Sequence, residues 1–124
     1  LGAAHLYFTF FSNKLTAYDE SVNAAMKSAS PVISKQTTVW QAMIGFNASH
    51  SLGILCFAFI YIYLASSYWD VLLQSRTLLL LPVVFSLIYT VLAWKYWFNV
   101  PLIGISISAV CFMVAAVLVL AGAN

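Results

Sequence analysis

The chain has 124 residues, of which 64% are hydrophobic and only 6% are charged, and its formal net charge is +2. So few charged side chains cannot coat a water-soluble globule of this size, and the composition therefore predicts a membrane protein whose main partner is the lipid bilayer. Phosphate recognition relies on clustered Lys and Arg, which the sequence lacks, so nucleic acid is not an expected partner.

The first apolar segment, residues 1–13, is too short to cross a bilayer. As a helix, the stretch LGAAHLYFTFFS reaches only about 18 Å, whereas a hydrocarbon core is about 30 Å thick. Either this segment dips partway into the membrane, or a first span is incomplete in this sequence. We expect the second, because His5 and Thr9 would otherwise lie in an unusually placed half-helix.

Residues 14–39 form a polar extramembrane loop that contains the helix breaker Pro31. Apolar residues recur in it at intervals of three or four, which allows a short helix on the membrane surface, with Thr16 and Asp19 at capping-box spacing. A solvated connector fits the same composition equally well. The spaced apolar residues are Leu15, Tyr18, Val22, Ala25 and Met26.

Three long apolar segments predict membrane-spanning helices at residues 40–66, 77–98 and 101–122. The last two are separated only by a turn near Asn99 and Pro101, which predicts a helical hairpin. Pro82 lies a turn or so into the 77–98 helix, where it kinks the helix or marks its start. Aromatic residues at the predicted boundaries indicate interfacial anchors, and they are Trp40, Tyr61, Tyr63, Tyr68, Trp69, Trp94, Tyr96, Trp97 and Phe98.

The predicted fold is therefore all-α: a single membrane domain over residues 1–124, built as a polytopic transmembrane bundle of four helices with the first incomplete. Four lysines, in the 14–39 loop and at the hairpin turn, fall on one side of the membrane, and Arg76 alone falls on the other. The positive-inside rule then predicts that the lysine side is cytoplasmic and that both ends of the chain lie on the far face.

Polar and small residues interrupt the first long span in a regular pattern. Gly45, Ser49 and Gly53 are four apart and so share one stripe of a helix. This small-xxx-small spacing lets two helix backbones approach closely in a membrane. The stripe is therefore predicted to be a helix-packing surface.

Asn47 and His50 lie beside this stripe, three residues apart, so both can face one partner helix. If Trp40 and Asn13 mark the same membrane interface, His50 lies roughly 15 Å below it and His5 roughly 12 Å below it. The first two helices would be antiparallel neighbours, and a pair between His5 and either Asn47 or His50 is geometrically allowed. These three residues are the candidate ligand-binding site.

Polar groups at such depth are costly, and three roles are open: locking two helices together, binding a haem, quinone or lipid headgroup, and catalysis or proton transfer. We favour locking. The spans hold no Asp or Glu to assist a His base, and the sequence has no phosphate loop, GxSxG or HExxH motif, so neither a catalytic residue nor a metal ligand set is assigned. Cys56 and Cys111 lie in apolar runs without a CxxC pair, which predicts small buried hydrophobes.

Two segments, LGAAHLYFTFFSNKL and WQAMIGFNASHSLG, resemble motifs of small, uncharacterised bacterial four-helix membrane proteins. In that family a Gly-x-x-His segment precedes a Gly-Phe-Asn-x-Ser-His-Ser-x-Gly segment. The resemblance covers about the first half of the chain, and His5 and the cluster from Gly45 to Gly53 are the positions that match. It implies a fold and a bacterial inner-membrane location without implying an activity.

The expected function is that of a non-catalytic accessory subunit that packs within a larger membrane protein complex. The alternative is a small membrane binding protein or enzyme that uses His5 and His50 for a haem, quinone or lipid ligand. An oligomeric channel or transporter is a third class, although the sequence lacks the repeated spans or buried ion-coupling carboxylate expected of one.

Overall fold

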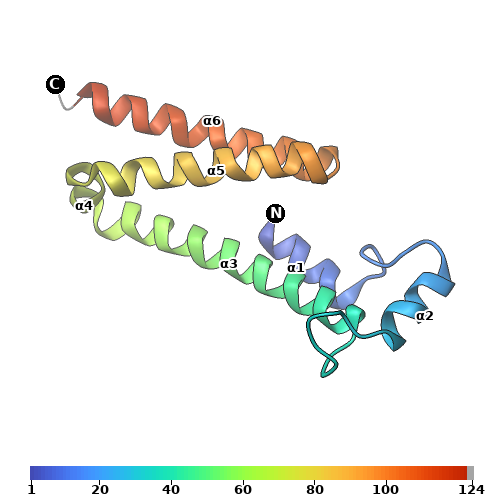
Figure 1. Ribbon diagram of the computed structural model, residues 1–124. Helices are drawn as coiled ribbons and strands as arrows, with labels where there is room; N and C mark the ends of the chain where they lie inside the picture. Colours follow the sequence, from blue (N-terminus) through green and yellow to red (C-terminus); the bar gives the residue numbers. More distant parts are fainter. Residues whose placement is uncertain (123–124) are drawn as a thin grey trace. The chain divides into compact units, whose positions relative to one another are not determined.

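The computed structural model describes residues 1–122, and within this range every regular element is a helix (Figure 1). The six helices are α1 (Gly2–Phe11), α2 (Glu20–Ser28), α3 (Val39–Ser67), α4 (Trp69–Gln74), α5 (Arg76–Tyr96) and α6 (Asn99–Gly122). Contacts divide the chain into two compact units, residues Leu1–Ile60 and residues from Tyr61 onward, so that α3 contributes to both. Each unit is described separately.

Three helices, α3, α5 and α6, are long and apolar enough to cross a membrane. Their bounds lie within a few residues of the predicted segments, and their length and composition indicate an integral membrane protein. The all-helical class is also confirmed. The short helix α1 accounts for the first apolar segment, while α4, which follows Tyr68, was not predicted.

The two cysteines correct one expectation. Cys56 on α3 and Cys111 on α6 are exposed on their helices rather than buried. Because both helices are long and mostly apolar, a thiol can face lipid there, and burial in a protein core is not required.

In the first unit, α1 packs against the N-terminal half of α3 in the antiparallel sense. Gly2 lies against Ser51 and Ile54, whereas His5, one turn later, meets Asn47, one turn earlier on α3. Thr9 and Ser51 are among the few buried polar residues. Small and hydroxyl-bearing side chains therefore fill the contact between these helices.

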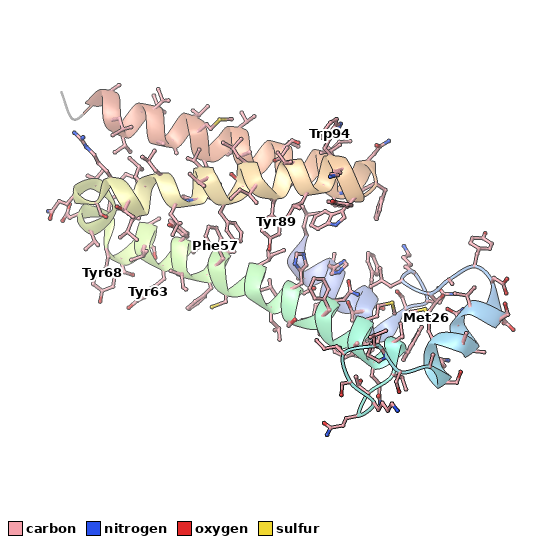
Figure 2. The ribbon with its side chains drawn as sticks, viewed as in Figure 1. Met26, Phe57, Tyr63, Tyr68, Tyr89 and Trp94 are labelled. Carbon is pink, nitrogen blue, oxygen red and sulfur yellow. The ribbon has the colours of Figure 1, made fainter. Side chains whose placement is uncertain are left out.

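The predicted short helix in the 14–39 segment is present as α2. Asp19 is its N-cap and accepts a hydrogen bond from the Ser21 N–H at 2.8 Å. The side chain of Asn23 forms two hydrogen bonds, each 2.9 Å, with the backbone N–H and carbonyl of Ala17. Met26 is half-buried on the side of α2 that faces the other helices of this unit (Figure 2).

A capping box is present, but at a different place from the predicted Thr16 and Asp19. The Gln41 N–H donates to Thr38 Oγ1 at 3.2 Å, and the Thr38 N–H donates to Gln41 Oε1 at 3.1 Å. This reciprocal pair satisfies two backbone donors at the start of α3. The Thr-x-x-Gln spacing is visible in the sequence and is the signal that locates it.

In the second unit, α5 and α6 form the predicted hairpin. Apart from Pro82, their buried residues are small: Ser86 and Ala93 on α5, and Ala109 and Ala116 on α6, each pair seven residues apart. This spacing places small side chains on one seam of each helix, where they allow close backbone approach in lipid. The hairpin turn follows Tyr96, where the Trp97 N–H closes α5 by donating to the Ala93 carbonyl.

Pro82 lies inside α5, so it does not mark the start of this helix. Proline has no N–H, and the carbonyl of Leu78, four residues earlier, consequently loses its helical partner. The Tyr61 hydroxyl donates to this carbonyl oxygen at 3.0 Å. Tyr61 is therefore not simply the interfacial anchor that was predicted.

Other aromatic residues do gather near the ends of the spans. Tyr63 and Tyr68 lie together around the end of α3, with ring centroids 5.4 Å apart and planes at 64° (Figure 2). Both are about half exposed, as expected of rings that sit between lipid and water.

Candidate functional site

The α1 side of the site is built from three residues spaced by one helical turn. Gly2, His5 and Thr9 follow each other at intervals of three and four, which places them on one face of α1. A Cβ built on Gly2 would come within 3.2 Å of Ile54 and 3.4 Å of the Ser51 carbonyl oxygen. Gly2 thus permits a close approach that brings the His5 ring to α3.

Asn47 is the residue on α3 that receives His5. The distance between His5 Nε2 and Asn47 Oδ1 is 2.9 Å, and Asn47 Nδ2 donates to the Met43 carbonyl at 2.8 Å. The second bond orients the amide, because only its nitrogen can donate. Its oxygen then faces His5, so His5 Nε2 carries a proton and donates it. This fixes the tautomer of a neutral His5 and leaves Nδ1 as its lone-pair nitrogen.

His50 lies next to this pair rather than within the hydrogen bond. Its ring meets that of His5 edge to face, with centroids 5.9 Å apart and an interplanar angle of 81°. On its other side it stacks on Phe46 at 6.2 Å and 15°. The structure therefore brings the three predicted ligand-binding residues together, with Asn47 and not His50 as the direct partner of His5.

Ser51 and Thr9 complete the site, although neither was among the ligand-binding residues predicted from the sequence. Ser51 is fully buried, and its hydroxyl donates to the Asn47 carbonyl at 2.9 Å. Thr9 Oγ1 donates to the His5 carbonyl at 2.8 Å. Each hydroxyl is thus satisfied within its own helix while filling the contact between two helices. The one-turn spacing of Gly2, His5 and Thr9 is the sequence signal for the α1 face.

The predicted packing stripe lies on a different face of α3. Gly45, Ser49 and Gly53 are all exposed, and no atom of the described chain outside the local helix comes within 4 Å of a Cβ built on either glycine. The Ser49 hydroxyl donates to the Phe46 carbonyl of its own helix. The residues from Gly45 to Gly53 therefore lie on two faces of α3. Asn47, His50 and Ser51 face α1, and the glycine stripe does not.

The chemistry available at the site is that of two imidazoles and an amide. Over residues 1–122, His, Cys, Asp and Glu form no group of three or more that could hold a metal ion. Nor does this part of the chain contain a buried side-chain nitrogen or oxygen without a hydrogen bond. A ligand that used His5 Nε2 would have to displace Asn47, whereas Nδ1 offers a lone pair without that rearrangement.

Comparison of the chain with protein-family models, with curated proteins and with solved structures found no match.

Proposed function

We propose that the protein is a non-catalytic accessory subunit of a larger membrane protein complex, built as a four-helix transmembrane bundle in which α1 is the short first member. The network around His5 and Asn47 locks α1 onto α3. Interhelical hydrogen bonds of this kind contribute about 0.6 kcal/mol each on average in membranes. The bond from His5 to Asn47 is supplemented by the close fit of Gly2 against α3.

One observation carries the subunit proposal: within the first unit, nothing covers the glycine stripe of α3. A face with small residues at Gly45, Ser49 and Gly53 suits the close approach of another helix, and α1 occupies the neighbouring face instead. Dispersion between closely packed backbones is a main driving force for helix association in lipid, so an open small-residue stripe favours a further helix as its partner.

Gentle-detergent purification from the native membrane tests this role. We expect stoichiometric partner subunits with the unaltered chain, and their loss with Gly45→Leu or Gly53→Leu. Ala58→Leu is the matched control, because Ala58 is also an exposed small residue of α3 but lies off the stripe. Partner subunits retained by both glycine variants would contradict the proposal, as would an unaltered chain that purifies alone.

A binding protein or enzyme that holds a haem, quinone or lipid headgroup at His5, Asn47 and His50 is the second candidate. The observation that favours it is the approach of two imidazoles to 5.9 Å between centroids, since histidine is an axial ligand of haem iron. A visible spectrum and lipid mass spectrometry of the same purified peak test this candidate. A stoichiometric pigment, quinone or lipid that is lost in His50→Ala while α1 stays docked would establish it. A purified peak without a pigment, quinone or lipid would contradict the binding-protein candidate and leave the subunit role as the proposal.

The resemblance to bacterial four-helix membrane proteins supports a location in the bacterial inner membrane. The two segments that carry the resemblance meet where α1 packs on α3: His5 pairs with Asn47, and Gly2 lies against Ser51. A shared contact gives a physical reason for the two motifs to occur together. Fractionation of the native host, with the chain followed into inner-membrane vesicles, tests the location.

A further inference from the structure

The segment between α2 and α3 exposes two apolar residues at a tight turn. The Ser34 N–H donates to the Pro31 carbonyl at 3.2 Å, which closes a four-residue turn with Val32 and Ile33 at its centre. Val32 and Ile33 are exposed to 109% and 93%. Turn centres in water favour Gly, Asn, Asp and Ser, because these residues suit both the backbone and the solvent. Two β-branched apolar residues at the centre of this turn indicate that the turn is not surrounded by water alone.

The turn is held near the first residue of α3, which limits what can surround Val32 and Ile33. The Val39 N–H donates to the Ala29 carbonyl at 2.9 Å, so the turn belongs to a loop whose two ends meet at the first residue of α3. Ile33 is six residues from Val39 and can lie at most about 20 Å from it, even if fully extended. The loop is therefore held close to the place where a membrane-spanning helix begins.

The residues around this base are typical of the membrane interface. Trp40 is the second residue of α3, and the Lys27 ammonium lies 5.0 Å from the centroid of its ring. Trp is enriched at the level of the lipid headgroups, where Lys also places its charge. Lys35 directly follows the turn and adds a further positive charge. An apolar tip next to lysines is complementary to a headgroup layer over hydrocarbon.

We propose that the Pro31–Ser34 turn inserts Val32 and Ile33 into the lipid interface of the bilayer that holds the chain's own spans. The occupant of this apolar surface is phospholipid, with the side chains below the phosphates and the neighbouring lysines at their level. The loop then serves as a second attachment that fixes how α2 and the start of α3 meet the membrane surface. This inference is independent of the subunit role.

Site-directed spin labelling tests the insertion. A nitroxide is placed at Ile33→Cys in a chain with Cys56→Ala and Cys111→Ala, both of which are exposed positions. The chain is reconstituted into vesicles of phosphatidylcholine with phosphatidylglycerol. Collisions with oxygen, which dissolves in hydrocarbon, are compared with collisions with a water-soluble nickel chelate. We expect an oxygen-to-nickel accessibility ratio several-fold higher at Ile33 than at the control.

Gln36→Cys is the matched control, since Gln36 is an exposed polar residue of the same loop. A nickel accessibility at Ile33 equal to that at Gln36 would place the turn in water and overturn the proposal. A label at Ile33 that neither oxygen nor nickel reaches would mean that a protein surface covers the turn, which also overturns it. Both labels sit on exposed positions, so the fold is not at risk from either substitution.

Discussion

The hydrogen bond between Tyr61 and Leu78 allows a sharp test of how the second unit is stabilised. Tyr61→Phe removes one hydroxyl and leaves the ring, which packs edge to face against Phe112 with centroids 6.4 Å apart. The change leaves the Leu78 carbonyl without the donor that replaces the missing N–H of Pro82. In lipid, a backbone carbonyl without a partner is costly, so Tyr61→Phe should destabilise the fold.

The expected magnitude follows from the position of this carbonyl. A hydrogen bond between membrane helices contributes about 0.6 kcal/mol on average, and leaving a buried acceptor unsatisfied adds about 1 to 3 kcal/mol. Leu78 is only three residues from the N-cap Ser75, or about 5 Å along the helix axis, where interfacial water relieves part of this cost. We therefore expect Tyr61→Phe to lower the free energy of unfolding by about 1 to 2 kcal/mol.

A double-mutant cycle with Pro82→Ala isolates the effect. The alanine substitution restores a backbone N–H that pairs with the Leu78 carbonyl within α5, so in this background Tyr61→Phe should cost only a few tenths of a kcal/mol. Unfolding in mixed micelles, followed by circular dichroism, gives the four free energies. Tyr7→Phe is the control, because no hydrogen bond of the Tyr7 hydroxyl is found within the described chain and its ring is exposed. An equal loss for Tyr61→Phe in both backgrounds would refute the reasoning.

Two further substitutions and one acid titration probe the first unit. Gly2→Val places methyl groups where even a Cβ lies 3.2 Å from Ile54, so α1 should separate from α3 and its amides should exchange faster by mass spectrometry. Thr38→Ala removes the cap of α3, should destabilise its first turn by about 1 kcal/mol, and should speed amide exchange there. Hydrogen bonds from the Ser21 hydroxyl and N–H hold the pKa of the Asp19 carboxyl below its ordinary value of 3.8. The stability that this cap gives α2 is therefore present above pH 3.8 and is lost as the pH falls through the lowered pKa. An acid titration followed by the ¹³C chemical shifts of α2 would report this loss.

Matched control variants separate the loss of these contacts from a general destabilisation of the fold. Gly45→Val should leave exchange in α1 unchanged, since a Cβ at Gly45 meets nothing within 4 Å in the described chain. Thr38→Ser keeps a hydroxyl acceptor and should behave like the unaltered chain. Asp19→Asn keeps an acceptor that does not titrate, so the acid-induced shift changes in α2 should disappear. Unchanged exchange in Gly2→Val or Thr38→Ala, or an acid transition that persists in Asp19→Asn, would contradict the corresponding contact.

Much of the candidate site could be predicted because depth in a membrane follows from counting residues. Each helical residue advances about 1.5 Å, so the sequence alone predicted similar depths for His5 and His50 and allowed a pair between His5 and either Asn47 or His50. The hydrogen bond shows that His5 pairs with Asn47. Which of Asn47 and His50 receives His5 could not be predicted, because the choice depends on the rotation of α1 and α3 about their axes.

The sequence by itself determined the helical class, the three long apolar helices and the hairpin, because a chain in lipid must satisfy its backbone hydrogen bonds within long apolar helices. Only the tertiary structure decided which faces meet: Ser51 against α1, the glycine stripe away from it, and Tyr61 at the Leu78 carbonyl. The physical reason is that most of the surface of a lipid-facing helix is apolar. Its pattern of hydrophobicity then carries little signal for the inward face, and contacts between side chains must set the rotation of each helix.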